Sequence, residues 1–190
     1  MSAINLGTLS GEPKQPVSYA GRWRITSAIT TSAAGDMTLT PSQLTLDTTY
    51  PNNNASALLN TSTAYFAITF PVSGIWSVTW NSRGAVTVPA NNYQEIWNYI
   101  GLHTYNGTAN KALGTAPDGP YRHAAFQNLW TNPTGNSLGW TAQHTPTITQ
   151  EFKAGDVCAP WYGTGSTAGF TLQPGTNGCQ FTVALIRRTS

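Results

Sequence analysis

The stretch that decides the fold is Phe66–Trp80, which reads FAITFPVSGIWSVTW. Apolar side chains alternate with small or polar ones on both sides of a turn, and the apolar positions are Phe66, Ile68, Phe70, Trp76, Val78 and Trp80. This period of two predicts two half-buried strands paired in a hairpin. Each buried aromatic ring removes roughly 150–250 Å² from water, so the apolar face of this hairpin needs a second layer to cover it.

The composition of the whole chain also favours β-structure. Its 190 residues suit one domain, and 39% hydrophobic and 11% aromatic residues provide a sizeable core. Charged residues are only 8%, against about 25% in an average soluble protein. Thr, Ser, Asn, Gln and Gly replace them, a mixture that favours strands joined by polar turns. We therefore predict a single all-β domain, and its neutral surface indicates an extracellular, virion-surface or assembled setting.

The distribution of charge argues against several partners. The net charge is +2, and the nine Lys and Arg residues are scattered, so no basic arm predicts nucleic-acid binding. No apolar run approaches the ~20 residues that span a bilayer, so we expect no membrane insertion. The first residues, MSAINLGTLSGEPKQP, lack the pattern of a signal peptide, and we expect a protein made in a cytoplasm that leaves by a route such as lysis.

Further strands are predicted from the same alternation. We expect them at Arg22–Thr30, Asp36–Leu46 (an edge or two short strands, because of Pro41), Ala85–Val88, Tyr93–Tyr105, Leu138–Phe152, Val157–Tyr162, Phe170–Leu172 and Phe181–Leu185. Asn106–Gly107 is the strongest signal for a tight hairpin turn. His123–Trp130 fits either a strand or a short helix.

Three motifs in this order resemble those of a known superfamily. They are Phe70, Gly74 and Trp76 in the central strand pair, the turn at Phe152, Ala154, Gly155, Asp156 and Val157, and a last strand that begins at Phe181. Together they are similar to tumour-necrosis-factor-like and complement globular-head-like domains, over roughly Arg22–Arg187. The resemblance implies a single jelly-roll β-sandwich that assembles as a homotrimer. Members without a stalk or anchor are similar to the spike and receptor-binding heads of bacteriophages. We expect an N-terminal arm or tether over residues 1–20 and the jelly roll over residues 21–190.

No residue pattern predicts catalysis or a metal. The carboxylates are spread singly, at Glu12, Asp36, Asp47, Glu95, Asp118, Glu151 and Asp156. Asp118 and Asp156 lie in Gly-containing turns, where we expect their side chains to bind local backbone N–H groups. His103, His123 and His144 lack partners at the spacing of a triad or zinc site. We expect no catalytic residues and no cofactor.

The two cysteines, Cys158 and Cys179, leave two alternatives open. They form one disulfide, or they remain two buried thiols. Free thiols are the commoner outcome in a protein made in a reducing cell.

Aromatic residues beside polar ones predict surface recognition. Rings flanked by Asn, Gln and Thr stack against sugars and form the energetic centres of protein interfaces. The candidate ligand-binding residues are Tyr93, Trp97, Tyr121, Trp130 and Trp140. In a trimer of this fold we expect Tyr65, Trp161 and Tyr162 to face neighbouring subunits. The alternative for each ring is burial in the core, to which we assign Trp76 and Trp80.

These expectations lead to a functional hypothesis with two alternatives. The first is a non-enzymatic protein of the virion surface, a phage spike or receptor-binding head that recognises a host saccharide or protein. The second is a capsid decoration or cement protein attached to other virion proteins through its N-terminal arm. The third is a secreted lectin-like module.

Overall fold

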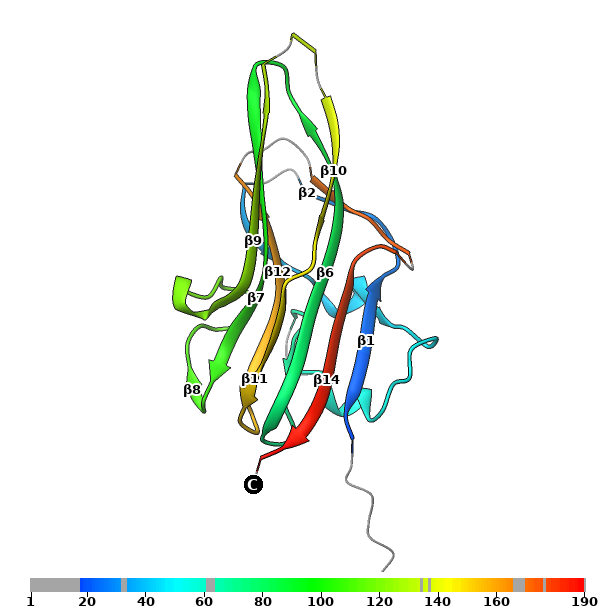
Figure 1. The fold of residues 1–190 in the computed structure, drawn as a ribbon, viewed down its shortest axis with the longest axis vertical. Coiled ribbons are helices and arrows are strands. Elements are labelled where there is room, and N and C mark those ends of the chain that lie inside the picture. The colour runs from blue at the N-terminus through cyan, green and yellow to red at the C-terminus, as the bar shows by residue number, and fades with distance from the viewer. Residues whose placement is uncertain are drawn as a thin grey trace, which may run out of the picture.

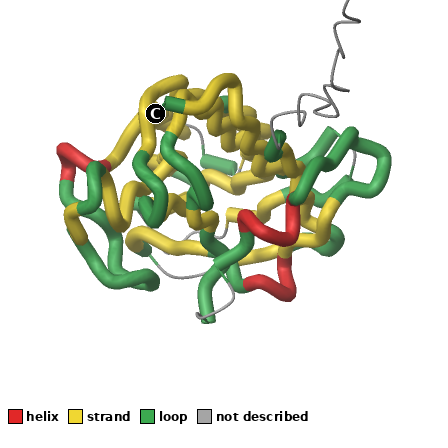
Figure 2. Tube along the Cα trace, turned by 90° about the horizontal axis from the view of Figure 1, so that it is seen from below, coloured by secondary structure: helices red, strands yellow, loops and turns green. Residues whose placement is uncertain are grey.

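Two antiparallel β-sheets packed face to face make up the fold. The computed structural model describes residues 18–31, 34–60, 64–133, 135–136, 138–165, 170–175 and 177–189. The first sheet has the order β2 (Ile29–Thr31), β13 (Phe170–Leu172), β6 (Gly74–Val88), β14 (Gln180–Arg188), β1 (Ala20–Ile25) and β4 (Leu44–Leu46), with β10 (Leu138–His144) and β11 (Thr147–Phe152) also paired to β6. The second has the order β3 (Gly35–Thr38), β12 (Val157–Thr164), β7 (Asn92–Tyr105) and β8 (Thr108–Ala109), with β5 (Ile68–Thr69) paired to β12 and β9 (Arg122–Asn132) to β7. Figure 2 shows the two layers along the length of the sandwich.

Strand β6 is the central strand of the first sheet, paired with four others. One edge of it pairs with β14 and β13, and the other edge pairs with β11 and β10. Its inward side chains Trp76, Val78 and Trp80 have no exposed surface, which confirms the predicted burial of both tryptophans. Strand β6 therefore supplies both the hydrogen bonds and the central rings of the core.

The predicted hairpin around Pro71–Gly74 is wrong. Strand β5 pairs with β12 in the second sheet, whereas β6 belongs to the first, so this turn carries the chain from one sheet to the other. Phe70 marks the crossing, because its ring stacks on Phe152 at 4.1 Å between centroids and meets Trp76 edge-on at 5.0 Å. Alternation defines the buried face of a strand but not its neighbour, and both segments bury the same face towards one core.

The other strand predictions follow the structure closely. Strand β7 covers the predicted Tyr93–Tyr105, and His123–Trp130 is the strand β9. Asn106 and Gly107 both adopt positive φ, 56° and 75°, in the tight turn between β7 and β8, as that sequence predicts. The expected arm lies mostly outside the described residues, and Ala20, assigned to it, already belongs to β1.

The end of the sandwich opposite the C-terminus has a polar interior. There β6 with β10, and β7 with β9, form two long pairs that reach beyond the other strands (Figure 1). Buried Gln94 donates to Thr164 Oγ1 at 2.9 Å. Buried Asn98 contacts one ring nitrogen of buried His144, and the exposed Asn128 contacts the other. Hydrogen bonds thus replace much of the apolar packing in this part of the interior.

The two turn aspartates behave differently. Asp156 is buried and accepts backbone N–H groups from Lys153 in its own turn and from Asn106 and Gly107 in the β7–β8 turn, all within 3.0 Å. The bond from Lys153 confirms the predicted local contact. The bonds from Asn106 and Gly107, which the sequence did not predict, join this turn to the β7–β8 turn. Asp118 makes no such side-chain bond, and the prediction for it is wrong. Its exposed carboxylate lies 3.6 Å from Lys111 Nζ instead.

Both cysteines are free and buried, so the disulfide alternative is excluded. Burial raises the pKa of Cys179 to about 11, and it also raises the pKa of Cys158. The Cys179 thiol donates to the Arg83 carbonyl at 3.1 Å and accepts the Arg83 N–H at 3.2 Å. Both thiols are therefore neutral core groups, and that of Cys179 is also hydrogen-bonded to the backbone of β6.

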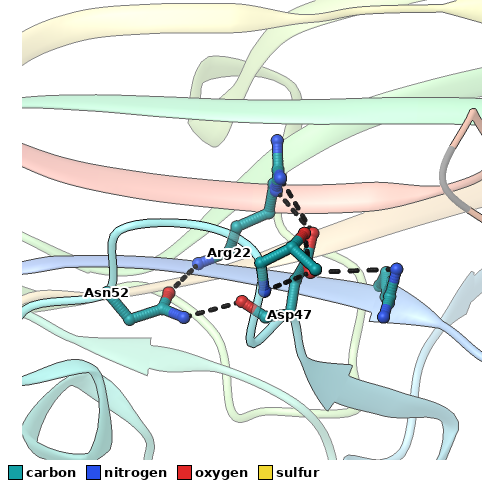
Figure 3. Close-up of polar contacts among 5 residues, drawn as sticks. Arg22, Asp47 and Asn52 are labelled. Atoms are coloured by element: carbon teal, nitrogen blue, oxygen red, sulfur yellow. Dashed lines mark hydrogen bonds and ion pairs between the residues drawn. The ribbon is translucent and has the colours of Figure 1, made fainter.

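A second buried carboxylate, Asp47, fixes the loop after β4 against β1 (Figure 3). Its Oδ2 accepts Arg22 Nε at 2.9 Å, and its Oδ1 accepts the Thr49 backbone N–H at 3.0 Å and hydroxyl at 2.7 Å. Asn52 then bridges the Asp47 carbonyl at 2.7 Å and the Arg22 N–H at 3.1 Å. The Thr49 hydroxyl bond is the leading cause that holds the pKa of Asp47 below its usual range, against the effect of burial.

We expect Asp47→Asn to lower the free energy of unfolding by about 2 kcal/mol, the value of a hydrogen bond to a charged group. At roughly 2–4 °C per kcal/mol the Tm at pH 7 falls by about 4–8 °C. Because the carboxylate's pKa is depressed in the fold, its stabilisation is present above pH 3.8 and disappears as the pH falls through the folded pKa. The Tm difference from the native protein therefore shrinks below pH 4, as calorimetry over pH 3–7 would measure.

Asp118→Asn is the control for this prediction, since the exposed Asp118–Lys111 pair contributes little to stability. Equal losses in the two variants would contradict the assignment.

Candidate functional site

The outward face of β7 and β9 holds the strongest candidate site. Along β7, Gln94, Ile96 and Asn98 point inward and are buried, so Glu95 and Trp97 point outward. A hollow of about 380 Å³ lies on this outer face, and its lining residues are Glu95, Trp97, Tyr99, Arg122, Ala125, Phe126 and Gln127. We call it the β7–β9 cup.

Trp97 is held in a defined position in the cup. Its indole Nε1–H donates to Asp36 Oδ1 on β3 at 2.6 Å. The ring crosses β12 at Gly163, where a Cβ atom would come within 2.3 Å of Trp97 Nε1. The ring is hydrogen-bonded to Asp36 at one edge and packed on Gly163 below, while the residue as a whole is half-buried. The ring is therefore an immobilised, partly open apolar platform.

Asp36 also orients Arg122 at the end of β9 nearest the cup. Arg122 Nη2 lies 2.7 Å from Asp36 Oδ2, and Arg122 Nε donates to the Pro117 carbonyl at 2.8 Å. The guanidinium lies 4.9 Å from the centroid of the Tyr99 ring. Burial, followed by the Asp36 charge, raises the pKa of Tyr99, so its phenol stays neutral. One carboxylate thus fixes both an indole and a guanidinium.

Glu95 and Gln127 complete the polar side of the cup. Gln127 Nε2 donates to Glu95 Oε1 across the β7–β9 pair. Asp36 and Arg122 balance each other, which leaves Glu95 as the uncompensated charge. The cup combines an aromatic platform, an amide, a carboxylate and the outer N–H groups of a guanidinium. These groups could bind a polar ligand that has flat apolar faces.

The predicted ligand-binding aromatics do not form one site. Tyr93 and Trp97 lie on the outward face of β7, and Tyr93 is 52% exposed. Trp130 is paired opposite buried Gln94 and packs against the main core, as does Tyr121 in the short turn Gly119–Tyr121. Trp140 belongs to β10, but its side chain lies outside the described part of the structure. The residues predicted in or beside loops therefore lie mainly on strands.

The predicted trimer-contact residues divide in a similar way. Tyr65 is 37% exposed and remains a candidate for contact with another chain. Trp161 and Tyr162 are 1% and 4% exposed, so the prediction that they face outward is wrong. Both are buried because β12 lies between β3 and β7 in the second sheet. Tyr162 packs into the main core on one face of the strand, and Trp161 packs against Ala67, Tyr99 and Ala159 on the other face.

Sequence reasoning missed Asp36, Tyr99, Arg122, Glu95 and Gln127. Glu95 carried a usable signal, because it lies two residues before Trp97 and shares its face in a strand. Asp36 and Arg122 are 86 residues apart and become neighbours only through the pairing of β3, β12, β7 and β9.

A second hollow, of about 410 Å³, lies beside His103 on the same sheet. Trp161 Nε1–H donates to His103 Nε2 at 3.1 Å, and His103 Nδ1 lies 3.1 Å from the Lys111 carbonyl. These partners require the neutral ring with its proton on Nδ1. Burial lowers the pKa of His103, in agreement with this tautomer. His103 therefore helps to hold the Trp161 ring in place on the outer face of the second sheet.

The described residues contain no group of three His, Cys, Asp or Glu side chains that could hold a metal ion. In the same part of the chain, the helical segments are the short turns Pro41–Gln43, Ala55–Leu58 and Gly119–Tyr121, and none is long and apolar enough to cross a membrane.

The architecture is that of a tumour-necrosis-factor-like jelly roll. The chain is similar to the solved structure of Eiger TNF from S. frugiperda, with a TM-score of 0.52 over 92% of this chain and 96% of that one. The two sequences are 10% identical, so the likeness establishes the fold alone. Neither a family model nor a curated protein matches the chain.

We expect the native protein to lose stability as the pH falls from 7.5 to 5.5. The folded pKa of His103 lies below 6.5, so the unfolded chain binds more protons in this range and stability rises with pH. His103→Gln preserves a donor and an acceptor but cannot titrate. Denaturant titrations should show a shallower pH dependence for the variant, by at most about 1.4 kcal/mol per pH unit. The comparison at pH 8 isolates the packing cost, and parallel pH profiles would contradict the prediction.

Proposed function

We propose that this protein is a non-enzymatic recognition head of a virion surface, such as a phage spike or receptor-binding head, and that it binds a host saccharide in the β7–β9 cup. The observation that carries the proposal is the immobilised Trp97 platform, bonded to Asp36 and supported over Gly163. A ring already fixed in the free protein loses little conformational entropy on binding, which favours affinity from a small contact.

The chemistry around the platform favours a sugar over a flat apolar partner. A saccharide presents C–H faces that pack on a ring and hydroxyl groups that need both donors and acceptors. Glu95 accepts, Gln127 donates and accepts, and the outer N–H groups of Arg122 donate. A protein-docking interface would instead bury about 800 Å² on each partner around an apolar centre.

The virion setting is supported by the charge-poor, Thr- and Asn-rich sequence and by the resemblance to jelly-roll heads of bacteriophage spikes. A homotrimer with Tyr65 near a subunit contact is part of the same proposal. The alternative, capsid decoration through the N-terminal arm, depends on residues 1–17, which lie outside the described structure.

We expect Trp97→Ala to weaken binding to host cells at least 30-fold, corresponding to a central contact of about 2 kcal/mol. Binding of the labelled intact protein to cells would be measured by flow cytometry. Ile186→Ala is the matched control, because Ile186 is 57% exposed on β14 of the other sheet. Treating the cells with periodate, which destroys sugar diols, should abolish binding, and protease treatment should not.

Unchanged cell binding by Trp97→Ala would overturn the choice of the cup. Binding lost after protease treatment but resistant to periodate would show that the receptor is a protein.

A further inference from the structure

The outward face of β7 continues from the cup to another hollow, distinct from the one beside His103. Alternation places Tyr93 on the same face as Trp97, at the start of β7. Strand β7 begins at the end of the molecule away from the C-terminus (Figure 1). Tyr93 borders a hollow of about 620 Å³, which we call the tip hollow and which is lined by Asn91, Asn92, Tyr93, Thr131, Asn132 and Pro133. Like the cup, this hollow combines an aromatic ring with side-chain amides, and it adds the hydroxyl of Thr131.

The spacing between the two rings sets the size of a ligand that would use both. Tyr93 and Trp97 are four residues apart on one strand, which corresponds to about 13 Å at ~3.3 Å per residue. A single sugar ring cannot cover that distance. Between them lies Glu95, with Leu129 directly opposite on β9 and 61% exposed. The surface between the rings is therefore accessible at Leu129 and partly accessible at Glu95.

The charges along this face define the kind of chain. Among the described residues that line the two hollows, Arg122 is the one cation, and Asp36 Oδ2 already lies 2.7 Å from its Nη2. Glu95 lies between the two rings, and no salt bridge to it is present among the described residues. A carboxylate on the ligand would approach this like charge, which disfavours acidic sugars.

Building on the proposed function, we propose that the cup and the tip hollow are subsites of one elongated site. Its ligand is an uncharged linear oligosaccharide of at least three sugar units, lying along β7 and β9. Trp97 and Tyr93 stack against two non-adjacent units. Glu95, Gln127 and Thr131 bind hydroxyl groups of the units between and beside them.

The test uses the full-length protein and linear uncharged oligosaccharides of two to six hexose units, together with the same chains bearing a terminal sialic acid. A printed array identifies the chain type that binds, and calorimetry then measures affinity against length. We expect at least a tenfold gain from two to four units and a plateau beyond five. Sialylated chains of equal length should bind at least fivefold more weakly.

Three variants separate the parts of the site. Tyr93→Ala should reduce the affinity for four units to that for two, and leave the two-unit affinity within twofold. Trp97→Ala should remove binding at both lengths. Glu95→Gln, which keeps the shape of the side chain, should remove the discrimination against sialylated chains. Thermal melting verifies folding, and these substitutions lie on an exposed or half-buried face.

The outcomes separate this inference from the function it rests on. Binding that does not depend on length, a preference for sialylated chains, or a Tyr93→Ala variant that keeps the length gain would overturn the elongated site. Those results would leave saccharide recognition by the cup intact. Absence of binding to every saccharide on the array would overturn the proposed function itself.

Discussion

The fold depends on β6 being hydrogen-bonded along both edges while its inward side chains seal the interior. Trp76, Val78 and Trp80 extend from this strand into the space between the sheets. The indole N–H of Trp80 also donates to the backbone carbonyl of Trp161 at 3.1 Å, a direct bond between the first sheet and the second. Burying such a large ring without that bond would leave an unsatisfied donor in the core. The same residue therefore supplies apolar area and fixes the position of β12.

The alternation of Phe66–Trp80 predicted burial correctly and pairing incorrectly. Both halves of the stretch place their rings in the core, which is all that a period of two determines. The partner of each half is decided by contacts distant in sequence, such as Val157 opposite Thr69 and Phe181 opposite Trp80. A Pro- and Gly-containing turn fits a crossing between sheets as well as it fits a hairpin. The pairing of β5 with β12, and not with β6, distinguishes the two.

The placement of Trp161 and Tyr162 shows a second limit of the sequence. Adjacent residues on a strand point to opposite faces, so two adjacent buried rings mean that both faces are covered. The run CAPWYG in β12 has this character, since the strand is buried almost throughout. The outer cover of Trp161 comes from Tyr99, with Trp97 and Leu113 packed alongside. The run predicts that both faces are covered, but not by which residues, because those that cover Trp161 lie elsewhere in the chain.

The polar interior near the tip bears on the site as much as on stability. A slip of one residue in the pairing of β7 would turn Trp97 and Tyr93 inward. An apolar interior would resist that slip only weakly, because rings would replace aliphatic side chains there. In the observed register Gln94 meets Thr164, and Asn98 meets His144. The slip would break both contacts and leave polar groups buried without partners, which is costly. The hidden amides of β7 therefore specify which of its rings face the solvent, and the recognition surface is determined from inside the sandwich.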